Sequence, residues 1–122
     1  MDNMTICKKI VEIEGLDLLK DGELDKSLLR ADELIVVNER WEDGSLKQFM
    51  VYNPLTDDAL CFQLMVKYRV KVMYEQHPDY YHASIMIYEP TKKPSRICES
   101  CDNPNRAICL AIIEAHKESN NE

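Results

Sequence analysis

Residues 53–64 read NPLTDDALCFQL, and residues 103–112 read NPNRAICLAI. Each stretch opens with an asparagine suited to a helix N-cap, followed by a proline in the first turn, where its missing N–H costs nothing. Both stretches therefore predict the start of a helix, with Asn53 and Asn103 as caps. Asp57 and Asp58 fall in the first turn of the first helix, where the dipole favours negative charge, so their pairing needs no acid–base chemistry.

The N-terminal half predicts a short helix and a hairpin. Apolar residues recur at helical spacing before Gly15, which suits a helix end. Residues 34–37 and 46–52 are rich in β-branched and aromatic side chains and flank an Asp-Gly turn within residues 42–45. Both strands are apolar on both faces, so both faces are expected to be covered. Leu16–Glu33 is predicted to hold a helical turn or a tethered loop.

The C-terminal half predicts a second hairpin and two further elements. Apolar and polar residues alternate through 70–74 and 83–88, across a connection that contains Pro78. Residues 95–101 have the composition of a short edge strand. The last helix is predicted to end at about Lys117.

These elements predict an α+β fold in the order α-β-β-α-β-β-(β)-α. Hairpins pair locally and helices need an apolar sheet face to cover, so we expect a four- or five-stranded, mostly antiparallel sheet packed with three helices, an α/β sandwich. A chain of 122 residues that is 45% hydrophobic can fill one core. We expect a single domain over residues 1–118 and a polar tail over residues 119–122.

Cysteine usage and the N-terminal sequence favour a soluble intracellular protein. There is no basic region followed by an apolar run, and no segment is apolar for long enough to span a bilayer. Five cysteines is an odd number, so reduced thiols are expected. Cys7, Cys61 and Cys109 fall on predicted helix faces and are interpreted as core residues.

The net charge of −7 argues against nucleic acid as a partner, because the 15 basic residues form no dense patch. Acidic charge most often serves solubility. The alternative is an acidic face that mimics DNA or engages a basic surface of a partner protein.

No constellation in the sequence predicts catalysis, and no cofactor is expected. The chain has three glycines and no glycine-rich loop, and its three histidines are scattered. Cys98 and Cys101 form a C-x-x-C pair, which in other settings binds zinc or exchanges disulfides. No other ligands lie at the spacing of a second knuckle, so we expect no metal and keep this pair only as an alternative.

Two segments, 52–68 and 103–115, resemble the phage α-β-α sandwich family of small phage and prophage proteins. In that family a stretch like the first begins the central helix and one like the second begins the final helix. The resemblance covers roughly the C-terminal two thirds of the chain and supplies no catalytic residue. It implies a phage-encoded accessory protein that acts in the host bacterial cytoplasm.

Two functional hypotheses follow from these observations. In the first, the protein is an interaction module that binds a host or phage protein, such as a component of a bacterial defence system that it inhibits. Exposed aromatic residues are typical of such surfaces, and the candidates are Trp41, Tyr80 and Tyr81. The last helix is apolar all round over residues 107–113, which also makes it a candidate homodimer interface.

In the second hypothesis, the protein is an oligomer that binds a small nucleotide signal at helix N-termini. Backbone N–H groups at a helix start attract anions, and arginine binds phosphate in a fork. The candidate residues are Asn103, Asn105 and Arg106 at the start of the last helix. The alternative is that Asn103 only caps this helix and Arg106 is a surface residue.

Overall fold

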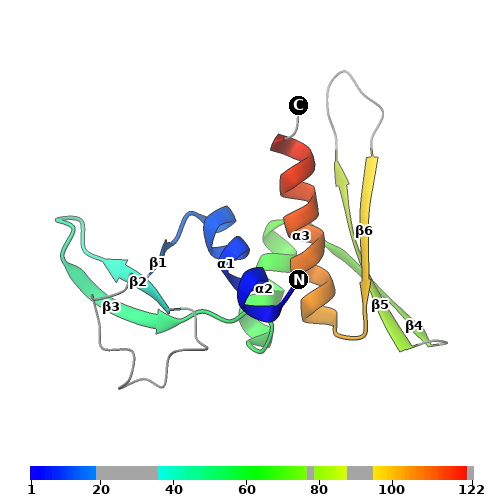
Figure 1. Ribbon diagram of the computed structural model, residues 1–122, viewed down its shortest axis with the longest axis horizontal. Coiled ribbons are helices and arrows are strands. Elements are labelled where there is room, and N and C mark those ends of the chain that lie inside the picture. The colour runs from blue at the N-terminus through cyan, green and yellow to red at the C-terminus, as the bar shows by residue number, and fades with distance from the viewer. Residues whose placement is uncertain (19–35, 77–78, 88–94, 121–122) are drawn as a thin grey trace. The chain divides into compact units, whose positions relative to one another are not determined.

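The computed structural model describes residues 1–18, 36–76, 79–87 and 95–120. The helices are α1 (Asn3–Glu14), α2 (Asp58–Lys67) and α3 (Pro104–Asn120), and the strands are β1 (Asp17–Leu18), β2 (Val36–Arg40), β3 (Leu46–Val51), β4 (Lys71–Gln76), β5 (Asp79–Ile87) and β6 (Ser95–Cys101) (Figure 1). The α+β class is thus confirmed. Contacts divide the chain into two compact units, Met1–Asn53 and Pro54–Glu122. The single domain expected over residues 1–118 stays a prediction.

The first unit begins with α1, as the sequence predicts. The Asp2 side chain caps the helix by accepting a hydrogen bond of 2.8 Å from the backbone N–H of Thr5. Gly15 ends it with a left-handed φ of 67°, a conformation that glycine adopts without steric cost. One face of the helix is buried through Ile6, Cys7, Ile10 and Val11.

Strands β1, β2 and β3 form an antiparallel sheet in that order. The predicted turn between β2 and β3 is confirmed, with Gly44 at a φ of 89°. The expectation that both faces of this hairpin are covered is wrong, because Met50 and Val51 are both exposed and successive strand residues point to opposite faces. The segment Leu16–Glu33 begins with β1, and its residues 19–33 lie outside the described part of the chain.

The second unit begins with a helix start that differs from the prediction. Asp57, not Asn53, caps α2: its side chain accepts a hydrogen bond of 3.1 Å from the N–H of Leu60. Residues 54–56 form a turn before the helix. Asn53 instead accepts a hydrogen bond of 3.5 Å from the Sγ of Cys7 within the first unit. Asp58 lies in the first turn, as predicted, whereas Asp57 is the cap rather than a first-turn residue.

Helix α3 begins where the sequence predicts, because the Asn103 side chain accepts a 3.1 Å hydrogen bond from the N–H of Arg106. It packs against α2 and covers β5 and β6 (Figure 1). Its apolar residues are buried within the chain (Ala107, Ile108, Cys109, Ala111, Ile112 and Ile113). This burial removes the reason for expecting a homodimer through α3. The helix runs to Asn120, three residues beyond the expected end at Lys117, and the polar tail over residues 119–122 stays a prediction.

The two units hold separate three-stranded sheets, so the single sheet of four or five strands that the sequence predicts is not found among the described residues. Each hairpin gains a third strand: β1 pairs with β2, and β6 pairs with β5. The predicted edge strand at Ser95–Cys101 is confirmed as β6. The pairing is antiparallel throughout, as expected.

Candidate functional site

The sheet β4-β5-β6 has one face packed against α3 and one face that no helix of its unit covers. The two faces follow from the alternation of side chains along β5 and from the strand register. Ala83 and Ile85 are buried on the side of α3, so the residues that alternate with them lie on the other side. We call that other side the open face. Its members are Lys71, Met73, Glu75, Tyr80, His82, Ser84, Met86, Arg96, Cys98 and Ser100.

Apolar side chains are exposed on the open face among charged ones. Met73 is 49% exposed, Tyr80 40% and Met86 44%. A large apolar side chain exposed alone is ordinary, whereas three on one sheet face with charged neighbours are typical of a binding surface.

A hydrogen-bonded chain crosses the three strands of the open face. His82 lies between Ser100, 2.6 Å from its Nδ1, and Glu75, 2.7 Å from its Nε2. A serine, a histidine and a carboxylate in this order also make up hydrolytic triads. Here Ser100 lies within a strand, whose successive N–H groups point in opposite directions and do not converge into an oxyanion hole. We therefore interpret these two hydrogen bonds as fixing the orientation of the imidazole ring of His82.

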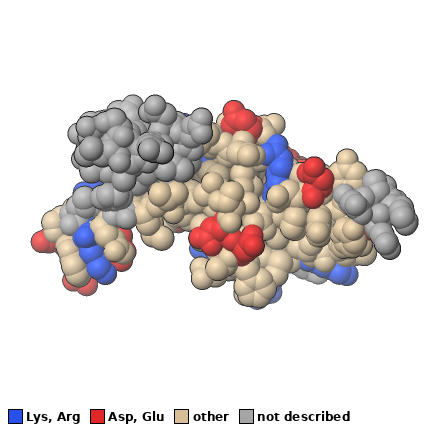
Figure 2. All heavy atoms as spheres, turned by 90° about the horizontal axis from the view of Figure 1, so that it is seen from below, with Lys and Arg blue, Asp and Glu red and all other residues tan. Residues whose placement is uncertain are grey.

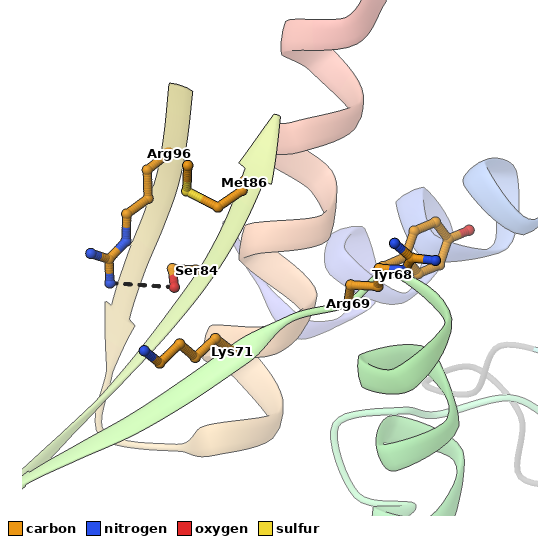
Figure 3. Close-up of a pocket in the computed structure, with 6 residues that line it drawn as sticks. All are labelled: Tyr68, Arg69, Lys71, Ser84, Met86 and Arg96. Atoms are coloured by element: carbon orange, nitrogen blue, oxygen red, sulfur yellow. Dashed lines mark hydrogen bonds between the residues drawn. The ribbon is translucent and has the colours of Figure 1, made fainter. Parts of the chain in front are cut away.

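An open pocket of about 530 Å³ lies at the other end of the open face, lined by Tyr68, Arg69, Lys71, Ser84, Met86 and Arg96. Ser84 is one of its lining residues and is only 6% exposed. Arg96 Nη2 donates to Ser84 Oγ at 3.4 Å, and Lys71 is the direct cross-strand neighbour of Ser84 (Figure 3). Figure 3 draws Tyr68 and Arg69 apart from these three, at the end of α2.

The pocket is positively charged in a chain whose net charge is −7. Its lining contains three basic side chains and no carboxylate. Some basic groups elsewhere pair with acids, as in the ion pairs of 3.3 Å between Lys47 and Glu39 and of 3.1 Å between Lys117 and Glu114. Within the described ranges, Arg69, Lys71 and Arg96 have no such ion-pair partner.

The start of α3 is the predicted anion site. In the structure, the side chains of Asn103 and Asn105 there are engaged in hydrogen bonds within the protein. Asn103 caps the helix, and Asn105 Nδ2 donates to the carbonyl of Leu55 at 3.2 Å and to Asp58 Oδ1 at 2.8 Å. The carboxylate of Asp58 would repel a phosphate bound beside Asn105. The geometry thus favours the structural interpretation of Asn103 and Asn105 over nucleotide binding.

The three predicted partner-binding aromatics do not form one surface. Tyr80 is on the open face, whereas Tyr81 points to the opposite face of the same strand and packs against Tyr74, with ring centroids 5.0 Å apart. Trp41 belongs to the first unit and is exposed in the β2–β3 turn, where Lys47 Nζ lies 4.8 Å from its ring centroid. Of the three, Tyr80 is the one that lies on the open face, together with Met73 and Met86.

The two cysteines of β6 are not placed to bind one metal ion together. Cys98 and Cys101 are three positions apart in a strand, so they point to opposite faces of the sheet. No group of three metal-ligating side chains occurs among the described residues. Cys7, Cys61 and Cys109 are buried, as predicted. A hydrogen bond with Cys109 lowers the pKa of the Cys61 thiol.

Figure 2 shows how the acidic residues are distributed on one face of the molecule. The Asp and Glu side chains stand in small separate groups, with uncharged and basic surface between them. On that face the negative charge does not gather into the continuous acidic surface that a DNA mimic needs.

The comparisons with known proteins identify no relative. The sequence matches no protein-family model and no curated protein, and the fold matches no solved structure. The resemblance to the phage α-β-α sandwich family therefore stays a prediction. None of the helices in the described ranges has the length and apolar composition needed to cross a bilayer.

The pocket is the feature that the sequence did not reveal. The alternation in β4 and β5 indicates that Lys71 and Ser84 each lie on a strand face. Their convergence with Arg96 depends on the registers of β4, β5 and β6, and the alternation by itself indicates which face a residue lies on but not which residue stands opposite it.

Proposed function

We propose that this protein is a non-enzymatic phage accessory protein that binds a host or phage protein through the open face of the β4-β5-β6 sheet. The observation that supports this proposal is the exposed apolar group of Met73, Tyr80 and Met86 on a sheet face that no helix of its unit covers. Protein interfaces combine such an apolar centre, in which tyrosine and methionine are enriched, with a polar rim.

The charged neighbours of the apolar group favour one kind of partner surface. Lys71 and Arg96 lie at the pocket end of the open face, and Glu75 lies opposite Tyr80. A partner that fits would present an apolar patch with acidic groups at the end that meets Lys71 and Arg96.

The phage origin and the bacterial cytoplasm as the place of action are part of the same proposal. They rest on the resemblance of residues 52–68 and 103–115 to the phage family. A phage accessory protein of this kind acts on proteins of the infected cell, so an inhibited component of a bacterial defence system is the partner to test first.

The test is capture of the partner by the tagged full-length protein from infected bacterial lysate, with mass spectrometry of what is retained. We expect one stoichiometric protein, and we expect Tyr80→Ala to weaken its binding by about thirtyfold, the effect of an interface hot spot of about 2 kcal/mol. Tyr74→Ala is the matched control, because Tyr74 is an exposed tyrosine of the same sheet on the opposite face.

The comparison of these variants separates the two faces. Loss of the partner in Tyr74→Ala but not in Tyr80→Ala would contradict the proposed surface, and loss in Trp41→Ala alone would move the interface to the first unit. Capture of no protein by the wild type would contradict the interaction-module proposal itself.

A further inference from the structure

We infer that the pocket around Ser84 binds a phosphate group carried by a small molecule. This site is separate from the start of α3, where the sequence places an anion. It shares Lys71, Met86 and Arg96 with the partner-binding face proposed above, and its test uses no protein partner. Its lining includes Lys71, Ser84 and Arg96, one from each strand of the sheet.

The first step is the unbalanced charge of the pocket. Lys71 and Arg96 flank the same hydroxyl group, and like charges that share a site repel one another. The chain has 22 acidic residues, yet none that the structure describes forms an ion pair with either side chain. A bound anion would supply the missing negative charge.

The second step is the donor geometry. Arg96 holds Ser84 Oγ at 3.4 Å through Nη2, which leaves the other N–H groups of its guanidinium for a ligand. The guanidinium fork matches phosphate oxygens, and the ammonium of Lys71 adds a second charge from the neighbouring strand. Ser84 itself lines the pocket and is only 6% exposed, so its hydroxyl lies between the two cations rather than projecting into solvent.

The third step is the choice of phosphate over carboxylate. A phosphate monoester carries about −1.5 to −2 charge near neutral pH, which balances two or three cations better than the single charge of a carboxylate. The pocket volume of about 530 Å³ exceeds what a free anion needs and is typical of a small-molecule site. Tyr68 and Met86 in its lining offer apolar surface to the remainder of such a molecule.

The experiment is calorimetric titration of the full-length protein with inorganic phosphate, adenosine monophosphate and adenosine at low ionic strength. We expect both phosphate probes to bind and adenosine not to bind. Tighter binding of adenosine monophosphate would show that Tyr68 and Met86 contribute, whereas equal binding would show that the phosphate group alone is recognised. Either result supports the site.

Variants connect that binding to the pocket. Lys71→Gln and Arg96→Gln should each weaken both phosphate probes by about tenfold, the effect of losing one charge-assisted hydrogen bond. Lys71→Arg should retain binding, because it keeps the charge. Lys117→Gln is the matched control: it removes one positive charge from an exposed lysine on α3 and should bind as the wild type does.

Two results would overturn the inference. One is the absence of binding by the wild type to either phosphate probe. The other is binding that Lys71→Gln and Arg96→Gln leave at the wild-type level, since the phosphate would then occupy a different place.

Discussion

Arg69 has a backbone conformation that glycine adopts more readily than arginine. Its φ is 55°, and it is the one non-glycine residue with positive φ among those that the structure describes. It follows the end of α2, where the N–H of Val70 bonds to the carbonyl of Met65 at 2.9 Å in the helix-ending pattern that usually places glycine here. The arginine therefore costs stability, while it supplies one of the three cations of the pocket.

We expect Arg69→Gly to raise the free energy of unfolding by about 1 kcal/mol, because it relieves the left-handed strain. The same change should weaken phosphate binding, since it removes a pocket cation. Urea denaturation and calorimetry measure the two effects. Arg69→Ala is the control, because it loses the charge but keeps a Cβ in the strained conformation; a gain in stability there as large as that of glycine would contradict the explanation.

A second residue, Glu99, makes the stability of the protein depend on pH. It lies in β6 on the face toward α3, where burial and the nearby charge of Glu114 raise the pKa of its carboxyl group. A folded-state pKa above the unfolded one means that ionisation costs stability at neutral pH, and that this cost disappears as the pH falls through the folded-state pKa.

We therefore expect Glu99→Gln to raise the midpoint of thermal unfolding at pH 7 and to have a smaller effect once the pH falls below the range in which glutamate ionises. Thermal unfolding followed by circular dichroism at several pH values across this range measures the difference between the variant and the wild type. Glu118→Gln on the exposed surface of α3 is the control. An advantage of Glu99→Gln that stayed constant with pH would show that ionisation is not its cause.

At the scale of elements, the sequence predicts which helices and strands exist better than where they begin. The two Asn-Pro pairs are locally alike, yet only Asn103 caps its helix. After Asn53, the chain offers a second capping residue at Asp57, and a turn over residues 54–56 fills the interval. Which cap is used depends on tertiary contacts such as that of Asn53 with Cys7, which local sequence does not contain.

The cap assignment is testable. We expect Asp57→Ala to lower the free energy of unfolding by about 1 kcal/mol, because the N–H of Leu60 loses its acceptor. Thr56→Ala, one residue earlier in the turn, should change the free energy of unfolding by only a few tenths of a kcal/mol. Urea titrations of both variants measure the difference, and equal effects would mean that the side chain of Asp57 does not cap α2.

At the scale of the whole molecule, the sequence predicts the antiparallel hairpins but not how they combine. Each hairpin pattern specifies its own two strands, whereas the third strand and the division into two sheets depend on longer-range contacts. The same limit applies to the candidate sites. Tyr80 and Tyr81 are adjacent in sequence and therefore look like one surface, but the pleat of β5 separates them, and the pocket residues come together only through strand register.

The two compact units give the last prediction. The unit Pro54–Glu122 contains a sheet, the helix α3 that covers it, and buried apolar side chains from both helices, including Leu64 of α2 and Ile112 of α3. Because compact units of this size can fold alone, we expect a fragment of residues 54–122 to unfold cooperatively on heating, as followed by circular dichroism. Leu64→Ala in this fragment should lower its stability by about 2–5 kcal/mol, which would show that this core holds it together. A fragment without a cooperative transition, beside a full chain with a single transition, would instead support the single domain that the sequence predicts over residues 1–118.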